Sequence, residues 1–321
     1  MSYPVEHPND QVVSTIAFGS CNDQNRPQPM WKQILQQNPD LFVWLGDNVY
    51  PDSENLDDIM VAYRKQLSNP DYKTFKSQVP IIGIWDDHDY GVNDGGKHFR
   101  NKGESKDFLL QFLGVDEEDS RHFRAGAYTS YTYGTPGKTV RIILIDTRYF
   151  RDNLKRNKEG YIPTVGDMLG LSQWSWLENQ FKHSEADVHI IASSIQVLPI
   201  EHPYEKWDNL TESRRKLFEL IQKYQPKNTF IISGDRHHAE FMELKLNGME
   251  QPLFEATSSS LNKPLNRDST WVEEANKYRI RSAIYQENYG LIRILWQGEN
   301  PSVMVDIKGV DNQHFMSHKV F

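Results

Sequence analysis

Four short apolar runs of the sequence each end in side chains that could bind a metal ion. The most informative run covers residues 41–45 and is followed by Gly46, where the chain can turn, and then by Asp47 and Tyr50. The runs at 12–18, 80–85 and 228–233 end in a similar manner, with Cys21, with Asp87 and His88, and with Asp235, His237 and His238. If these runs are neighbouring strands of a parallel sheet, their ends meet at one edge. The repeated pattern therefore predicts a metal site at that edge.

The types of these side chains predict two metal ions of different chemistry. Asp47 is the expected bridge between them, because it follows the central strand and has candidate ligands close by in the sequence. Cys21 as a thiolate and Tyr50 as a phenolate suit Fe(III) better than Mg²⁺ or Ca²⁺. A harder ion prefers carboxylate and amide oxygens, and a second set of these belongs to Asp87, Asn93 and Asp235.

The histidines near these strand ends are expected to differ in role. His88 is the candidate that protonates a leaving-group oxygen, or stabilises its charge, because the metal ions have other ligands. If residues 237 and 238 continue a strand, alternation points their side chains to opposite faces. Only one of the two then reaches the metals, and we favour His237.

Each of these residues also has an explanation that requires no function. Asp47 could cap a turn or the next helix, and Cys21 could be a small buried hydrophobic residue. His88 could be a loop histidine that bonds a neighbouring aspartate. The repetition at four strand ends favours the metal site over these separate explanations.

Composition and charge limit the class of protein. The 321 residues are 38% hydrophobic and 12% aromatic, which is typical of a globular protein with a sizeable core. The formal net charge is −8 at pH 7 and no run of Lys and Arg forms a basic stripe, which argues against a nucleic-acid scaffold. An anionic substrate would therefore need positive charge from metal ions. The single cysteine excludes an intrachain disulfide, and no apolar stretch is long enough for a transmembrane helix.

The order of expected elements predicts an α/β fold. Apolar runs alternate with amphipathic helical segments up to residue 233, as in βαβ units. Apolar runs from residue 241 onward follow one another without helices, which predicts a second sheet packed against the first. Because no linker or repeat is visible, we predict one domain over 1–321, with the functional motifs at 16–245 and a β-rich part at 246–321.

These motifs resemble those of a known enzyme family. The sequences GSC at 19–21, GDNVY at 46–50, WDDHDYGVNDGG at 85–96, DTRYFRD at 146–152 and SGDRHHAE at 233–240 are similar, in content and in order, to the motif series of PhoD-type alkaline phosphatases. That group is a branch of the calcineurin-like metallophosphoesterases. Five ordered motifs are much more specific than any one of them.

The resemblance implies a four-layer sandwich of two β-sheets flanked by helices, and hydrolysis of small phosphomonoesters or phosphodiesters by a metal-bound hydroxide. It implies Fe(III) paired with Ca²⁺, although other divalent ions also fit. By position, the iron ligands correspond to Cys21, Asp47, Tyr50 and His237, with Asp47 bridging. The second metal corresponds to Asp87 and Asp235, and the histidine that assists the leaving group corresponds to His88.

Several assignments stay open within this resemblance. The commoner calcineurin-like pattern opens with Asp-x-His and has a metal-binding histidine after a middle strand, where this chain has Gln196 as a candidate. Asn93 could bind calcium or order its own loop. Arg148 and Arg236 could contact phosphate oxygens or form structural ion pairs. An aromatic rim for the substrate could come from Tyr90, Tyr149, Tyr204 and Trp207, although such residues are more often in the core.

Two other functions are compatible with these residues. The same scaffold could serve a nuclease or a lipid phosphodiesterase, and a non-catalytic domain could use the aspartates for a structural calcium ion. Cys21 and Tyr50 argue against the calcium-only alternative, because neither suits such a site.

The first eleven residues contain no apolar signal core, so the chain is either cytoplasmic or a mature form whose export signal was removed. The resemblance favours a periplasmic or secreted enzyme.

Overall fold

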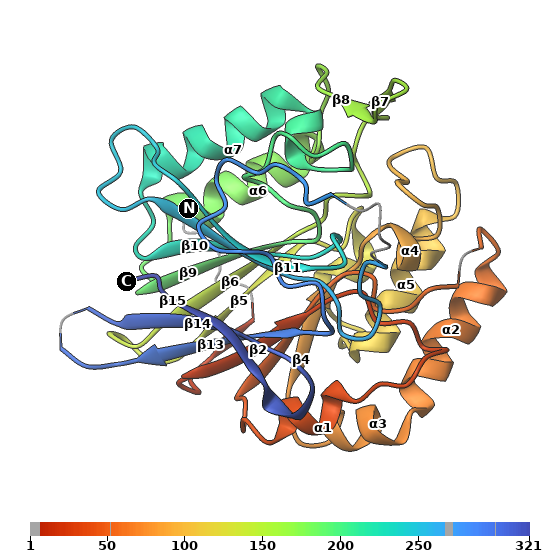
Figure 1. The fold of residues 1–321 in the computed structure, drawn as a ribbon, viewed down its shortest axis with the longest axis horizontal. Helices are drawn as coiled ribbons and strands as arrows, with labels where there is room; N and C mark the ends of the chain where they lie inside the picture. Colours follow the sequence, from red (N-terminus) through yellow and green to blue (C-terminus); the bar gives the residue numbers. More distant parts are fainter. Residues whose placement is uncertain (1–6, 52, 267–271, 299) are drawn as a thin grey trace.

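The computed structural model describes residues 7–51, 53–266, 272–298 and 300–321. Two β-sheets pack face to face, and helices cover the outer face of each sheet (Figure 1). The layers are therefore helices, sheet, sheet and helices. This arrangement confirms the expected α/β sandwich.

The six-stranded sheet has the order β15-β14-β13-β2-β3-β4. Its parallel half consists of the first three long strands of the chain, β2 (Thr15–Gly19), β3 (Leu41–Leu45) and β4 (Ile81–Ile84). Its antiparallel half comes from the end of the chain and consists of β13 (Tyr289–Leu295), β14 (Ser302–Lys308) and β15 (His314–Lys319). The two halves join where β13 pairs with β2.

The seven-stranded sheet has the order β1-β5-β6-β9-β10-β12-β11. In chain order, its strands are β1 (Pro8–Asn9), β5 (Thr129–Tyr133), β6 (Val140–Ile145), β9 (Val188–Ser193), β10 (Thr229–Ser233), β11 (Ala239–Leu244) and β12 (Leu253–Ser258). The strands β6, β9, β10 and β12 run parallel, so their carboxyl ends share one edge.

The helices fall into two groups, one on each outer face. The six-stranded sheet is covered by α1 (Met30–Leu35), α2 (Leu56–Ser68), α3 (Pro70–Lys76) and α5 (Lys102–Leu113). The seven-stranded sheet is covered by α6 (Gly170–Lys182) and α7 (Thr211–Tyr224). The shorter elements are α4 (Asp87–Tyr90), three 3-10 turns (Ser120–Phe123, Trp207–Asn209 and Val310–Asn312) and a hairpin of β7 (Lys155–Arg156) and β8 (Tyr161–Ile162).

Three apolar clusters hold these layers together. Val43 of β3 meets Ile142 and Ile190 of the other sheet in the cluster between the sheets. Alternate residues of the same strands point the other way, so Trp44 packs against the helices of its own side. Both faces of the central strands are therefore buried, which explains why the sequence shows continuous apolar runs there rather than alternation.

The distribution of strands corrects two expectations. The run at 228–233, which is β10, does not lie beside β2, β3 and β4 but belongs to the other sheet. The strands after residue 241 do not form a sheet of their own, because β11 and β12 join one sheet and β13 to β15 join the other. Apolar patterning identifies strands but does not reveal their partners.

Among the described residues, no helix has the length and apolar character needed to cross a membrane.

Candidate metal centre

The candidate ligands meet where the carboxyl ends of strands from both sheets come together. Cys21 and Asp47 follow β2 and β3 of one sheet, whereas Asp235 and His237 follow β10 of the other. All four have positive φ angles, of 56°, 51°, 71° and 55°. Such conformations cost energy for residues other than glycine, and they cluster at functional sites. Four strained residues in one place indicate that the fold holds these side chains in position at some cost to stability.

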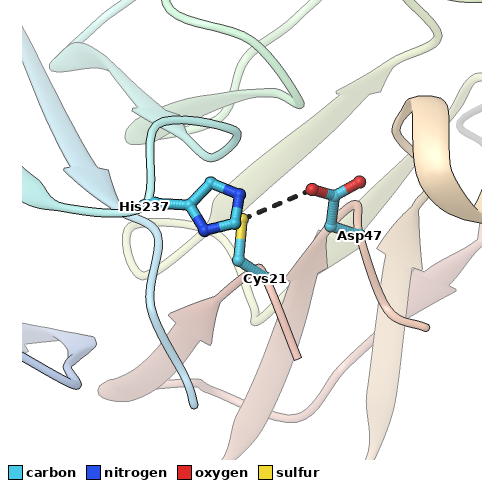
Figure 2. A group of neighbouring side chains, drawn as sticks. All are labelled: Cys21, Asp47 and His237. Carbon is cyan, nitrogen blue, oxygen red and sulfur yellow. Dashed lines mark hydrogen bonds between the residues drawn. The ribbon is translucent and has the colours of Figure 1, made fainter. Parts of the chain in front are cut away.

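One group of donors surrounds the Asp47 carboxylate (Figure 2). Asp47 Oδ2 accepts a hydrogen bond from the Tyr50 hydroxyl at 2.7 Å and lies 3.4 Å from Cys21 Sγ. The Tyr50 hydroxyl is also 3.4 Å from His237 Nε2. A thiol, a phenol, a carboxylate and an imidazole thus converge on a small volume, and Cys21, Asp47 and Tyr50 are almost completely buried.

The backbone fixes which nitrogen of His237 faces this group. His237 Nδ1 makes a hydrogen bond to the backbone carbonyl of Lys263, so Nε2 is left toward Tyr50. This is a common way to orient a metal-binding histidine. His238 turns toward Glu240 instead, with Nε2 3.4 Å from a carboxylate oxygen. His237 thus lies with the other candidate donors and His238 does not, and both residues precede β11 rather than continue a strand.

A second group of donors adjoins the first and shares Asp47 with it. Asp87 lies with Asp47 and His88 in one set of donor atoms, and with Asp86 and Asp235 in another, each within 4.8 Å. Asp47 Oδ1 faces this side, where it lies 3.4 Å from the backbone nitrogen of His88. Asp86 and Asp87 each have one buried oxygen for which the described part of the chain offers no hydrogen-bond partner. Buried, unpaired carboxylate oxygens are costly and fit coordination to cations.

The electrostatics of these acids also favour bound cations. Burial, and then the charges of Cys21, Asp87 and Asp89, raise the pKa of Asp47 well above its usual range. Burial raises the pKa of Asp235 to about 7. For Asp87, burial acts to raise the pKa, but neighbouring Arg148 and His88 and hydrogen bonds from Asp94 and Asp47 outweigh it and lower the pKa to about 2. A cation would restore the ionised forms of Asp47 and Asp235, so the donor set fits metal binding.

A cleft of about 320 Å³ opens over the second group. Asp47, Asp87, Asp235 and His237 contribute to its lining, and His88 and Asn93 lie between it and a neighbouring hollow of about 280 Å³. The His88 ring packs against Tyr50, with 4.3 Å between the ring centroids. A ligand over Asp47 would therefore have His88 at its side.

A family model described as PhoD-like phosphatase matches residues 16–292. The chain belongs to the PhoD-like phosphatase family. Alkaline phosphatase D of Bacillus subtilis (strain 168) is 23% identical over 292 residues, which cover 77% of this chain and 48% of that protein. The chain thus spans about half the length of this curated relative.

The solved structures that share this fold include phosphatases and a protein described as an anchor. PhoD itself has a TM-score of 0.74 at 17% identity, over 99% of this chain and 73% of that one. GAP50, described as the anchor in the inner membrane complex of Plasmodium, has a TM-score of 0.62 at 14% identity, over 96% and 89%. A dimetal phosphatase from Danio rerio has a TM-score of 0.58 at 10% identity, over 97% and 99%. Because an anchor and two phosphatases share this fold, the side chains at the site must decide its activity.

Three other candidates of the PhoD-like pattern lie in different surroundings. Arg148 is fully buried, forms an ion pair with Asp86 and donates a 2.6 Å hydrogen bond to Glu205, which matches the structural alternative for this residue. Arg236 lines the cleft, but its guanidinium pairs with Glu274. The Gln196 amide nitrogen donates to Glu240 and to Thr257.

Asp89 is a residue of the site that the sequence analysis missed. Its buried carboxylate accepts hydrogen bonds from the backbone nitrogens of Asp86 at 2.7 Å and Asp47 at 3.2 Å, and from the Tyr63 hydroxyl at 3.1 Å. It thereby joins the loop after β3 to the start of α4. The signal was present, because Asp86 and Asp89 have the spacing of a capping box at a helix start.

Of the four aromatic residues considered for a substrate rim, three lie elsewhere. Tyr90 and Trp207 are fully buried in the core, and Tyr149 borders a different hollow. Of the four residues expected, Tyr204 lines the cleft, and Tyr161 of β8 lines it as well.

Proposed function

We propose that the protein is a metal-dependent phosphoric ester hydrolase that acts on small phosphomonoesters or phosphodiesters. We further propose that Cys21, Asp47, Tyr50 and His237 bind Fe(III), and that Asp47, Asp87 and Asp235 bind Ca²⁺. The observation that carries this proposal is the position of Asp47, with one oxygen toward the thiol and phenol and the other toward the second group of acids. Thiolate and phenolate donors on one side and carboxylates alone on the other suit two different ions.

Bound metal ions would withdraw charge from the phosphoryl oxygens and make water acidic enough to attack phosphorus as hydroxide. The chain's own residues would then handle the leaving group. His88 lies between two hollows of the surface and beside Asp47, a position suited to donating a proton to the departing oxygen. Asn93, exposed at the same junction, would contact the substrate or order its loop.

Other substrates fit the site less well. A net charge of −8 and a small cleft rich in acids disfavour a long nucleic acid. A calcium-binding domain without catalysis would not explain why Cys21 and Tyr50 are buried beside Asp47, because neither a thiol nor a phenol suits calcium. We also propose that the enzyme works outside the cytoplasm, where calcium is abundant enough for a site of modest affinity.

The proposal is tested by the metal content, the visible spectrum and the hydrolytic activity of the purified protein. We expect iron and calcium together, a charge-transfer band from a tyrosinate bound to Fe(III), and hydrolysis of p-nitrophenyl phosphate or its bis-ester. Tyr50→Phe should abolish the band. Tyr63→Phe is the matched control, because Tyr63 is also buried but donates to Asp89.

A different metal content would overturn the assignment. Zinc or calcium alone, with no band and no hydrolysis after iron is added, would rule out Fe(III) at Cys21 and Tyr50. It would favour the calcium-binding alternative.

A further inference from the structure

The wall of the cleft includes a small hairpin that projects from the fold (Figure 1). The hairpin consists of β7 and β8, in which Arg156 pairs directly with Tyr161. Both residues line the same cleft as Asp47, Asp87 and His237. The candidate ligands Asp47 and Asp87 are buried at the floor, whereas Arg156 is exposed. Arg156 therefore stands at the rim, beyond the place where phosphorus would bind.

The hairpin is held firmly in this position. The backbone nitrogen of Tyr161 donates to the carbonyl of Pro203 at 2.8 Å, and Gly160 packs so closely on Pro203 that a Cβ there would lie 2.4 Å from it. The Tyr161 hydroxyl donates to Asp94 Oδ2 at 2.6 Å. The backbone nitrogen of Asp94 donates in turn to Asp87 Oδ2 at 2.7 Å. A short chain of hydrogen bonds thus connects the hairpin to a candidate metal ligand.

Several charged groups of this wall form ion pairs, but Arg156 does not do so with any described residue. Arg236 pairs with Glu274 and stacks over Tyr204, with 4.4 Å from the guanidinium carbon to the ring centroid. Glu205 pairs with two buried arginines. Arg156 lies over the Tyr161 ring at 5.3 Å but has no carboxylate partner among the residues that the structure describes. It is an exposed positive charge in the lining of the cleft.

We propose that Arg156 binds a second anionic group of the substrate, separate from the phosphorus that is attacked. The site would thus favour phosphoric esters that carry such a group over esters that do not. An arginine stacked on an aromatic ring keeps its planar donors free for the oxygens of a phosphate or carboxylate. This inference rests on the proposed hydrolase function and adds a substrate class to it.

The test uses p-nitrophenyl phosphodiesters whose second ester is a short alkyl chain. The chains differ only at the far end, which is a methyl, a phosphonate or a carboxylate, and the readout is KM for release of p-nitrophenol by the metal-loaded enzyme. We expect KM to be lower for the phosphonate-ended ester than for the methyl-ended ester by roughly fivefold, the size of one exposed charge contact. The carboxylate-ended ester shows whether the subsite accepts any anion or phosphate-like groups alone. The preference should weaken in high salt.

Two variants separate a specific contact from general electrostatics. Arg156→Gln should bring the ratio of the two KM values close to one. Lys155→Gln changes the net charge equally, but Lys155 is the preceding residue of the same strand, so its side chain points to the opposite face. This control should keep the wild-type ratio.

Each contrary result has a distinct meaning. If the wild type hydrolyses both esters with equal KM, or if both variants lose the preference equally, the Arg156 subsite is wrong and the hydrolase function stands. If the metal-loaded enzyme hydrolyses none of the esters, the hydrolase function fails and the subsite proposal fails with it.

Discussion

Asp47 determines more of the site than any other single side chain. It has a left-handed backbone conformation, it is buried, and its two oxygens face two different sets of donors. The backbone nitrogen and the side-chain nitrogen of Asn48 both donate hydrogen bonds to the Asp89 carboxylate. These bonds fix the loop that carries Asp47. Backbone geometry and buried hydrogen bonds therefore set the position of this carboxylate.

Replacement of His88 by Asn should lower kcat and leave the metal content unchanged. Loss of a general acid typically costs about 10²- to 10⁴-fold. The loss should be larger for alkyl esters than for p-nitrophenyl esters, because a good leaving group needs no proton. The measurement is kcat for a series of leaving groups, and His98→Asn is the control, since His98 is exposed on the loop that follows α4.

The opposite pattern would assign His88 a different role. A ring nitrogen of His88 also lies within 4.8 Å of carboxylate oxygens of Asp47 and Asp87, so the three could share one ion. An equal loss for all leaving groups, together with loss of metal, would make it a ligand rather than a proton donor.

At this scale the sequence indicates which side chains the fold brings together, but not which groups they bond. Cys21, Asp47 and His237 were predicted because each follows the end of a strand, a place that depends on local sequence. Asp89 and Tyr161 were missed because their roles depend on groups that the fold brings near. The burial of Arg148 between Asp86 and Glu205 likewise follows from tertiary packing, which no local pattern records.

Among the elements, prediction succeeded where an apolar pattern coincides with clear boundaries. The strand at Leu41–Leu45 has the expected limits. The strand β15 was missed because its residues alternate weakly in polarity, and the hairpin of β7 and β8 was missed because each strand has only two residues. Short and weakly patterned strands depend on their neighbours for their conformation.

An added side chain at Gly290 should disturb the packing where β13 pairs with β2. A Cβ there would lie 2.1 Å from the Phe18 ring, which belongs to the core between the sheets. Gly290→Ala should destabilise the protein by about 1–3 kcal/mol, through overpacking at this pair. Chemical denaturation measures the change in unfolding free energy.

Gly103→Ala is the matched control for this prediction. Gly103 lies in α5 with no atom within 4 Å of an added Cβ, so alanine should stabilise by up to about 1 kcal/mol through helix propensity. If the two variants have the same stability, the close packing of Gly290 on Phe18 does not limit this junction.

The whole molecule carries a formal net charge of −8, and the candidate metal centre brings together the carboxylates of Asp47, Asp87 and Asp235. Removal of the metals should therefore lower Tm, and by more at high pH than at low pH. The folded pKa of Asp235 without metal is about 7, above its usual 3.8, so the metal-free fold loses stability as pH rises through this range. Metal binding also strengthens as protons leave the ligands.

Thermal unfolding with and without a chelator checks this prediction. The difference in Tm between the two conditions should be greater at about pH 8 than at about pH 5.5, by roughly 5 °C or more. Asp235→Asn, which removes one of the crowded carboxylates, should reduce this widening. A difference that is the same at both pH values would show that charge crowding does not govern the metal-free protein.

The origin of the ligands in two separate sheets has a consequence for the order of folding. Cys21 and Asp47 reach their final places with one sheet, and Asp235 and His237 with the other. The complete set of donors therefore exists only after the sheets have docked, late in folding, because contacts so distant in sequence form slowly. Metal ions would therefore bind in the last step of folding and would dissociate before the two sheets separate. A chelator should accordingly raise the unfolding rate and leave the refolding rate almost unchanged, so the lifetime of the native state depends on how tightly its metals are held.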